Sequence, residues 1–219
     1  MFGGSTPVHA ISSEAQLHQS TGEVTFRGQA RLWQDANSVL APVVVLNRIR
    51  QTMTAHAQNS AEPVRLTLLS TNGKDATKSD LIRLRGGDLR YSDNERRALL
   101  EAGSLSSVTA ETSLATSSSR EMELILLPAG KGSGQLDRMI ARGHVALTTE
   151  GRRGIGEQLI YTSRSGEYVL TGTSSIPPHI TDAAHGSISG EAIHFFSHDD
   201  SVTVEGGRSG THTETRTPR

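Results

Sequence analysis

The chain has 219 residues, of which 34% are hydrophobic and only 4% aromatic, and its formal net charge is −1. This composition excludes a thick core and favours thin sheets with one buried face and one wet face, while the balanced charge predicts no nucleic-acid partner. Cysteine and any run of 18 apolar residues are absent from the sequence. Disulfides, zinc–thiolate sites and an apolar membrane-spanning helix are thereby excluded.

The first segment, residues 1–20, is polar and aperiodic, and we expect a flexible lead-in or one edge strand. The segment after Met1 has neither a basic region nor an apolar region, so no export signal is visible. We therefore expect either a cytoplasmic protein or a fragment that lacks its export signal.

The first clear strand runs from Gly22 to Trp33. Its apolar residues fall on one parity and its polar residues on the other, which is the period of a strand with one buried face. Trp33 lies on the wet parity, where it is expected to cap an edge or meet a partner.

The segment from Ser38 to Met53 can be a helix or two strands. Pro42 and the valines that follow it disfavour a helix. We predict a strand at Val43–Leu46, a turn, and a return strand at Thr52–Ala55.

Further strands are predicted at Val64–Leu68, Leu81–Tyr91 and Glu121–Leu127. Ser92–Glu95 resembles a helix capping box but also suits a hairpin turn, and the repeated pattern favours the hairpin. Ser104–Arg120 is rich in Ser and Thr, which predicts irregular strands.

The sum of these elements is an all-β chain of about 12 to 16 short strands. We predict one β domain over residues 21–206 and a disordered tail over residues 207–219, where Gly, Ser, Thr, Arg and Pro follow no period.

An internal repeat spans Gly143 to Gly206. The same order occurs twice: an alternating strand, an apolar–aromatic triplet, a polar turn and a second alternating strand. Tyr161 and Phe195, which end the two triplets, lie 34 residues apart. Repetition at this period is typical of one supersecondary unit stacked on copies of itself.

Motifs of catalysis and metal binding are weak. Gly130–Gly134 and Gly151–Gly156 lack the spacing and the helix of a phosphate loop, so both are interpreted as hairpin loops. His194 and His198 would share a face on a helix, but on a strand they lie about 13 Å apart, too far for one ion. We predict no catalytic residue, no metal and no cofactor, and hence a protein that is not an enzyme.

One long apolar face remains. It is consistent with an ordinary β core or with an open groove for acyl chains.

The sequence also resembles the LptA/OstA-like family of periplasmic lipopolysaccharide transport proteins. The matching motifs are Ala141-x-Gly143-x-Val145, then Leu159-x-Tyr161 through Gly166-x-Tyr168-x-Leu170-x-Gly172, and finally Gly186–Gly190 with Ile193, Phe195 and Val202–Gly206. Weaker copies occur at Gly22–Leu46 and Leu89–Tyr91.

The resemblance implies an open, taco-shaped antiparallel β-jellyroll whose apolar interior holds the acyl chains of lipid A. The expected inward residues of this lipid groove are Val24, Phe26, Leu32, Val145, Leu147, Leu159, Tyr161, Tyr168, Leu170, Ile193 and Phe195. Such domains join edge to edge with other jellyroll domains of the transport bridge, and the expected pairing edges are Val24, Thr25 and Phe26 at one end and Val202, Thr203 and Val204 at the other.

The function implied is a non-enzymatic carrier of lipopolysaccharide in the periplasm, between the inner and outer membranes. The alternative is a structural β scaffold that assembles through its edge strands and binds no lipid.

Overall fold

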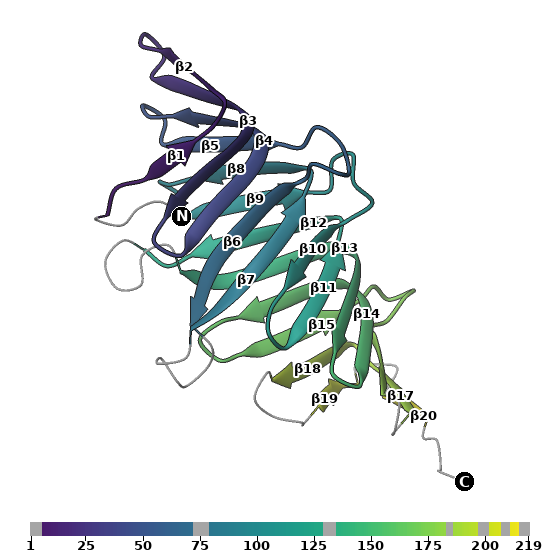
Figure 1. Cartoon of the computed structure of the whole chain (residues 1–219). Helices are drawn as coiled ribbons and strands as arrows, with labels where there is room; N and C mark the ends of the chain where they lie inside the picture. Colours follow the sequence, from purple (N-terminus) through teal and green to yellow (C-terminus); the bar gives the residue numbers. More distant parts are fainter. Residues whose placement is uncertain are drawn as a thin grey trace.

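A computed structural model describes residues 6–71, 79–128, 135–182, 186–196, 202–206 and 211–214. Within these ranges the chain is all-β and contains twenty strands and no α-helix, and therefore no helix that could span a membrane. The strands form a ladder along the long axis of the molecule, from the N-terminal end to the C-terminal end (Figure 1).

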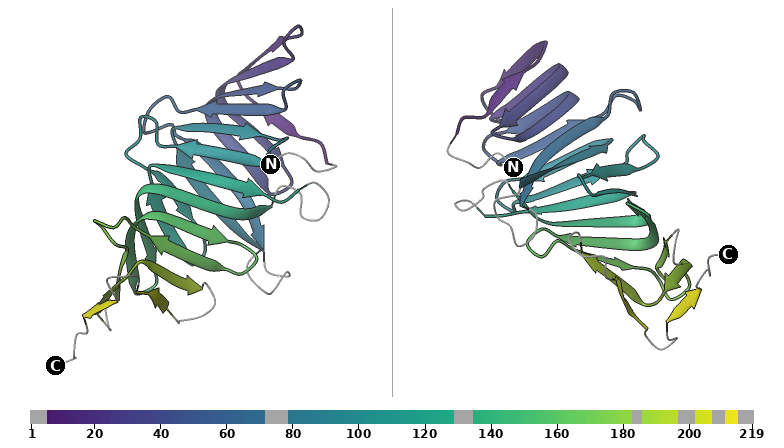
Figure 2. Two further views of the ribbon diagram at one scale, coloured as in Figure 1. Left: turned by 180° about the vertical axis from the view of Figure 1, so that it is seen from behind. Right: turned by 60° about the horizontal axis from the view of Figure 1, so that its bottom comes forward.

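The sheet is folded into two facing layers, which we call wall I and wall II (Figure 2). Successive strand pairs alternate between the walls, and four long strands belong to both. The strands shared by the walls are β3 (Glu23–Gln34), β4 (Asn37–Asn47), β13 (Leu136–Thr149) and β14 (Arg152–Thr162).

Wall I is completed by strands that pair antiparallel in chain order. These are β2 (Glu14–His18), β5 (Thr52–His56), β8 (Asp88–Ser92), β9 (Arg97–Glu101), β12 (Glu121–Leu126), β15 (Glu167–Thr171), β18 (Ala192–Phe196) and β19 (Val202–Glu205).

Wall II is completed in the same way. Its further strands are β1 (His9–Ile11), β6 (Val64–Thr71), β7 (Ser79–Gly86), β10 (Val108–Glu111), β11 (Ala115–Ser119), β16 (His179–Asp182), β17 (Gly186–Ser189) and β20 (His212–Glu214).

The walls meet along a spine, the line at which the chain crosses from one wall to the other. On β3 the pair Gly28–Gln29 opposes the single residue Pro42, because the register shifts between Arg27 and Ala30. Two residues against one form a β-bulge, which bends a strand and lets it turn from one sheet into another.

The same bulge recurs on β13. Gly143 and His144 there oppose one residue of β14. Gly28 and Gly143 both have φ of +80°, a conformation that favours glycine, and the next residue is left-handed in both bulges. The Arg-Gly-polar sequence therefore builds one corner twice, which explains the similarity of Gly22–Leu46 to the later repeats.

Most of the strand predictions are confirmed. Val43–Leu46 and Thr52–Ala55 are strands rather than a helix, and the segment after Ser92 is a hairpin turn into β9. The irregular segment Ser104–Arg120 contains the two regular strands β10 and β11.

Two predictions about strands were wrong. Twenty strands exceed the predicted 12 to 16, because polar segments at both ends of the chain also pair as strands. The tail is not wholly disordered, since β20 pairs with β17 at Ser187–Ser189. Residues 1–20, expected to be a flexible lead-in or one edge strand, contain the two strands β1 and β2.

Candidate functional site

The predicted inward residues lie between the two walls. Nine of the eleven, from Leu32 to Phe195, are at most 7% exposed, while Val24 and Phe26 are half-buried. The nine buried residues belong to one apolar cluster whose members range from Ala30 to Phe195, and Phe26 packs against it. In this structure the interior is filled by the protein's own side chains, so these residues form its core.

Side chains that lie opposite one another on neighbouring strands form rows across this interior. In wall I, Tyr161 pairs with Tyr168, and Tyr168 pairs with Phe195. The rings of Tyr161 and Tyr168 are tilted with their centroids 4.6 Å apart, and those of Tyr168 and Phe195 are stacked at 5.0 Å. The 34-residue repeat therefore brings Tyr161 and Phe195 to the same level of two strands that flank β15. Burial raises the pKa of both tyrosines, so their phenols stay neutral.

The mouth of the interior lies opposite the spine, where the hairpin turns of the walls approach one another. Leu136 of β13 pairs with Ser70 of β6 in parallel, which joins the two walls directly. A shallow pocket beside this bridge is lined by residues of both walls: Ser70, Asp80, Ile82, Thr112, Leu114, Tyr161 and Tyr168.

The interior is less covered at its N-terminal end. Leu17 of β2 pairs with Val24, which pairs with Leu46 on the other side, and the three continue the apolar row of wall I. Leu17 is nevertheless 53% exposed, and Val24 and Leu46 are half-buried. An apolar surface of this kind, open at one end of a packed interior, can contact a partner or an apolar ligand.

One of the two predicted edges is misplaced. Val24, Thr25 and Phe26 lie inside wall I, because β2 pairs with β3 on one side and β4 on the other. The N-terminal edge of this wall is instead β2, whose residues Glu14–His18 are all exposed. Val202, Thr203 and Val204 do lie at an edge, since β19 has β18 as its neighbour among the described strands.

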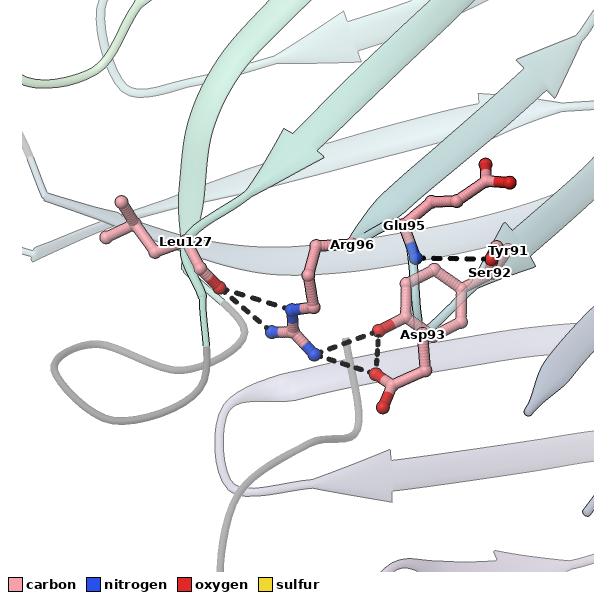
Figure 3. A network of polar contacts seen from close by, with 6 residues as sticks. All are labelled: Tyr91, Ser92, Asp93, Glu95, Arg96 and Leu127. Carbon is pink, nitrogen blue, oxygen red and sulfur yellow. Dashed lines mark hydrogen bonds and ion pairs between the residues drawn. The ribbon is translucent and has the colours of Figure 1, made fainter.

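A polar network that the sequence did not predict fixes the mouth of wall I (Figure 3). Arg96 has its φ at +52° and donates to the carboxylate of Asp93 at 2.7 Å and to the carbonyl oxygen of Leu127 at 3.1 and 3.2 Å. Tyr91 donates its phenol proton to the same carboxylate.

The network joins neighbouring hairpins. The amide of Asp93 donates to Gln51 in the preceding turn, and the amide of Leu126 donates to Arg96. Three successive hairpins of wall I are thereby tied at their tips. The Asp-x-x-Arg spacing after Tyr91 is the signal in the sequence, but the partner Leu127 is 31 residues away from Arg96.

The candidate metal residues do not form a site. His194 lies on the outer face of wall I between Glu167, at 3.1 Å, and Glu205, at 3.4 Å. No group of three metal-binding side chains occurs among the described residues. His198 and all of Gly130–Gly134 lie outside the described ranges. Gly151 lies in a turn as expected, whereas Arg152–Gly156, expected to belong to the hairpin loop, begin β14.

Comparisons with known proteins give one finding. No family model and no curated protein matches the chain. Among solved structures, the chain is similar to LptH from Pseudomonas aeruginosa, described as the LptA homologous periplasmic component of the conserved lipopolysaccharide transport device. The match covers 67% of this chain and 96% of LptH, with 13% identity and a TM-score of 0.48. At this level the similarity concerns the antiparallel β fold alone.

Proposed function

We propose that the chain is a non-enzymatic carrier of lipopolysaccharide in the periplasm, with the acyl chains of lipid A held between the two walls. The observation that carries this proposal is the continuous apolar interior, which runs from Ala30 to Phe195 and reaches the N-terminal end half-exposed. The motifs around Gly143 and Tyr161 that resemble the LptA/OstA-like family support the same function.

The interior has the length that such a ligand needs. Wall I consists of twelve successive strand segments from β2 to β19, and neighbouring strands lie about 4.8 Å apart, which gives a length of about 50 Å. Acyl chains bound along this axis are removed from water, and each buried methylene group contributes about 0.8 kcal/mol.

Lipid binding requires the walls to part, because core side chains now fill the space between them. The spine consists of continuous strands and bulges, so separation there would break many backbone hydrogen bonds. Within the described part of the chain, the backbone connection between the walls at the mouth is the Leu136–Ser70 bridge. We therefore propose that the walls open at the mouth, starting from the N-terminal end, where Leu17 and Phe26 are already accessible.

The edge strands supply a route from one domain to the next. An unpaired strand offers its N–H and C=O groups to another chain, and β2 and β19 occupy opposite ends of wall I. Head-to-tail pairing of β19 with β2 of a neighbouring jellyroll domain would extend wall I and the apolar interior together.

Photocrosslinking tests the lipid-binding part of this proposal. A photoreactive residue at Phe195 faces the interior, whereas the same residue at His194 faces outward. After incubation with purified lipopolysaccharide, we expect labelled lipid on the Phe195 variant and none on the His194 variant. Equal labelling at both positions, or labelling at His194 alone, would contradict a ligand held between the walls.

Edge pairing is tested by two proline variants, Gln16→Pro in β2 and Thr203→Pro in β19, because proline lacks the N–H that a strand donates. Either variant alone is expected to stay monomeric in sedimentation experiments at concentrations where the unmodified chain associates. A mixture of the two is expected to stop at dimers, since each retains the edge that the other needs. Larger assemblies of either single variant would overturn head-to-tail pairing.

The packed interior also supports the second candidate, a scaffold that assembles through β2 and β19 without lipid. This function predicts association of the unmodified chain together with an unlabelled Phe195 variant. Native mass spectrometry that finds filaments free of lipid would favour it.

A further inference from the structure

The pocket at the mouth differs chemically from the interior beside it. Its walls combine the apolar side chains Ile82 and Leu114 with the polar groups of Ser70, Asp80, Thr112 and two tyrosines. It lies beside the Leu136–Ser70 bridge, so a ligand that enters between the walls there passes it.

Most polar groups of the pocket already have partners. Asp80 accepts hydrogen bonds from the amide of Leu81 at 2.8 Å and from the hydroxyl of Ser113 at 2.7 Å. The hydroxyl of Thr112 donates to the carbonyl oxygen of Ala115 at 3.2 Å. The ring of Tyr168 is tilted against Tyr161 and stacked on Phe195, so it is not free to receive a planar or sugar ligand.

Ser70 is the exception. Its side chain is 1% exposed, and its hydroxyl is buried with no hydrogen-bond partner among the residues that the structure describes. The Ser70 hydroxyl opposes the rise that burial causes in the pKa of Tyr161, so it lies near the Tyr161 phenol, although the two groups do not meet the geometry of a hydrogen bond. An unpaired buried hydroxyl is unfavourable, and a ligand or a water molecule that pairs with it recovers this free energy.

A second buried serine at the mouth shows the contrast. Ser163 is 2% exposed, and its hydroxyl lies 2.7 Å from the carbonyl oxygen of Leu136 and 3.0 Å from that of Asp137. The fold therefore provides hydrogen-bond partners for the hydroxyl of Ser163 and leaves the hydroxyl of Ser70 available to a ligand in the pocket.

We propose that this pocket is a subsite for one uncharged hydroxyl group carried on an apolar chain. The inference deepens the proposed function and rests on it. The carboxylate of Asp80 and the neutral phenols disfavour an anionic group, and the described lining residues include no Lys or Arg. The cavity volume of the pocket is about 10 Å³, roughly the space that one water-sized group needs. It therefore suits a single functional group.

The test compares decan-1-ol with 1-methoxydecane by isothermal titration of the full chain. The two probes share their apolar chain, but the ether cannot donate a hydrogen bond. We expect decan-1-ol to bind about fivefold more tightly, the value of one net hydrogen bond of about 1 kcal/mol. Ser70→Ala is expected to bind the two probes about equally, because the hydroxyl group that accepts the hydrogen bond of decan-1-ol is lost.

Ser163→Ala is the matched control. It is expected to lower stability more than Ser70→Ala, because it breaks an existing hydrogen bond, and to keep the fivefold preference. Tyr161→Phe is a second variant within the pocket and is expected to weaken the preference without changing the binding of the ether.

The outcomes are distinguishable. Equal binding of both probes to the unmodified chain would mean that the pocket holds an ordered water only, and it would overturn the subsite while the apolar interior still binds. If Ser70→Ala still binds decan-1-ol more tightly than the ether, the hydroxyl group of the probe binds at a place other than Ser70. Failure of both probes to bind a folded chain would contradict the proposed function as well.

Discussion

The middle of the molecule and its N-terminal end are built from the same corner but differ in how they are covered. On β13 the bulge at Gly143 lies between Ala141 and Val145, and both of these side chains are fully buried. On β3 the same bulge at Gly28 has Phe26 half-exposed on one side and Ala30 buried on the other. The local sequence sets the bend, and the presence of strands on both sides and across the interior decides whether it becomes a closed core.

This difference suggests a division of roles. The middle, tied by the Leu136–Ser70 bridge and the Arg96 network, supplies stability. The N-terminal end, with Leu17 and Phe26 accessible, supplies the entrance. Three predictions test the contrast, in order of decreasing effect.

The largest effect is expected from truncated leucines. Leu159→Ala in the middle removes a fully buried side chain and should lower the free energy of unfolding by about 2–5 kcal/mol. Leu17→Ala at the N-terminal end should change it by about 0.5 kcal/mol or less, because Leu17 is already 53% exposed. Urea unfolding measures both, and similar losses would contradict the division.

The bulge glycines should differ less. Gly143→Ala introduces a side chain at φ +80° and places its Cβ about 3.0 Å from the side chain of Arg120, so we expect a loss of about 1–3 kcal/mol. Gly28→Ala has the same φ, and its Cβ would lie 2.6 Å from the Oγ and 2.7 Å from the Cβ of Ser13, closer than the contact at Gly143. Ser13 is exposed and lies between the short edge strands β1 and β2, so we expect this segment to shift. We expect about 1 kcal/mol there. A larger loss at Gly28 in urea unfolding would show that the N-terminal corner is the more rigid one.

The smallest effect concerns pH. Burial alone would raise the pKa of Glu123, but hydrogen bonds from Arg142 and Arg97 outweigh it and hold that pKa below its usual range. A lowered pKa in the folded state stabilises the fold above the unfolded value of about 4.5, and this contribution is lost as pH falls through the folded pKa.

Glu123→Gln is therefore expected to flatten the decline in melting temperature below about pH 4.5. Glu14→Gln, in the fully exposed β2, is the control at the N-terminal end and should leave the decline unchanged. An equal flattening by both variants would remove the special role of the Arg97–Glu123–Arg142 group.

The sequence predicted what alternation encodes: the all-β class, the strands around Val24, Val145 and Leu170, and the inward parity of Phe195. It did not predict β2, because Glu14–His18 pairs through its backbone while its side chains stay in water and follow no apolar period. Val24–Phe26 was consequently taken for an edge.

Long-range contacts were also beyond prediction. Ser70 follows the predicted strand Val64–Leu68 and is polar, yet it is buried beside Tyr161, 91 positions later. In β11 the inward positions are the small polar residues Ser117 and Ser119, both buried, which hid the strand in a segment rich in Ser and Thr. Contacts with the opposing wall bury these serines, and the alternation of apolar and polar residues along one strand does not reveal such contacts.

The most direct measurement of the central claim is the distance between the walls at the mouth, with and without lipopolysaccharide. Spin labels at Leu114, in the β10–β11 turn of wall II, and Arg164, in the β14–β15 turn of wall I, would report it by electron spin resonance. The pair Asn94 and Arg164, both in turns of wall I, is the control. We predict that bound lipopolysaccharide lengthens the first distance and leaves the second unchanged. Saturating lipopolysaccharide that binds without changing the first distance would contradict a carrier whose walls part around its ligand.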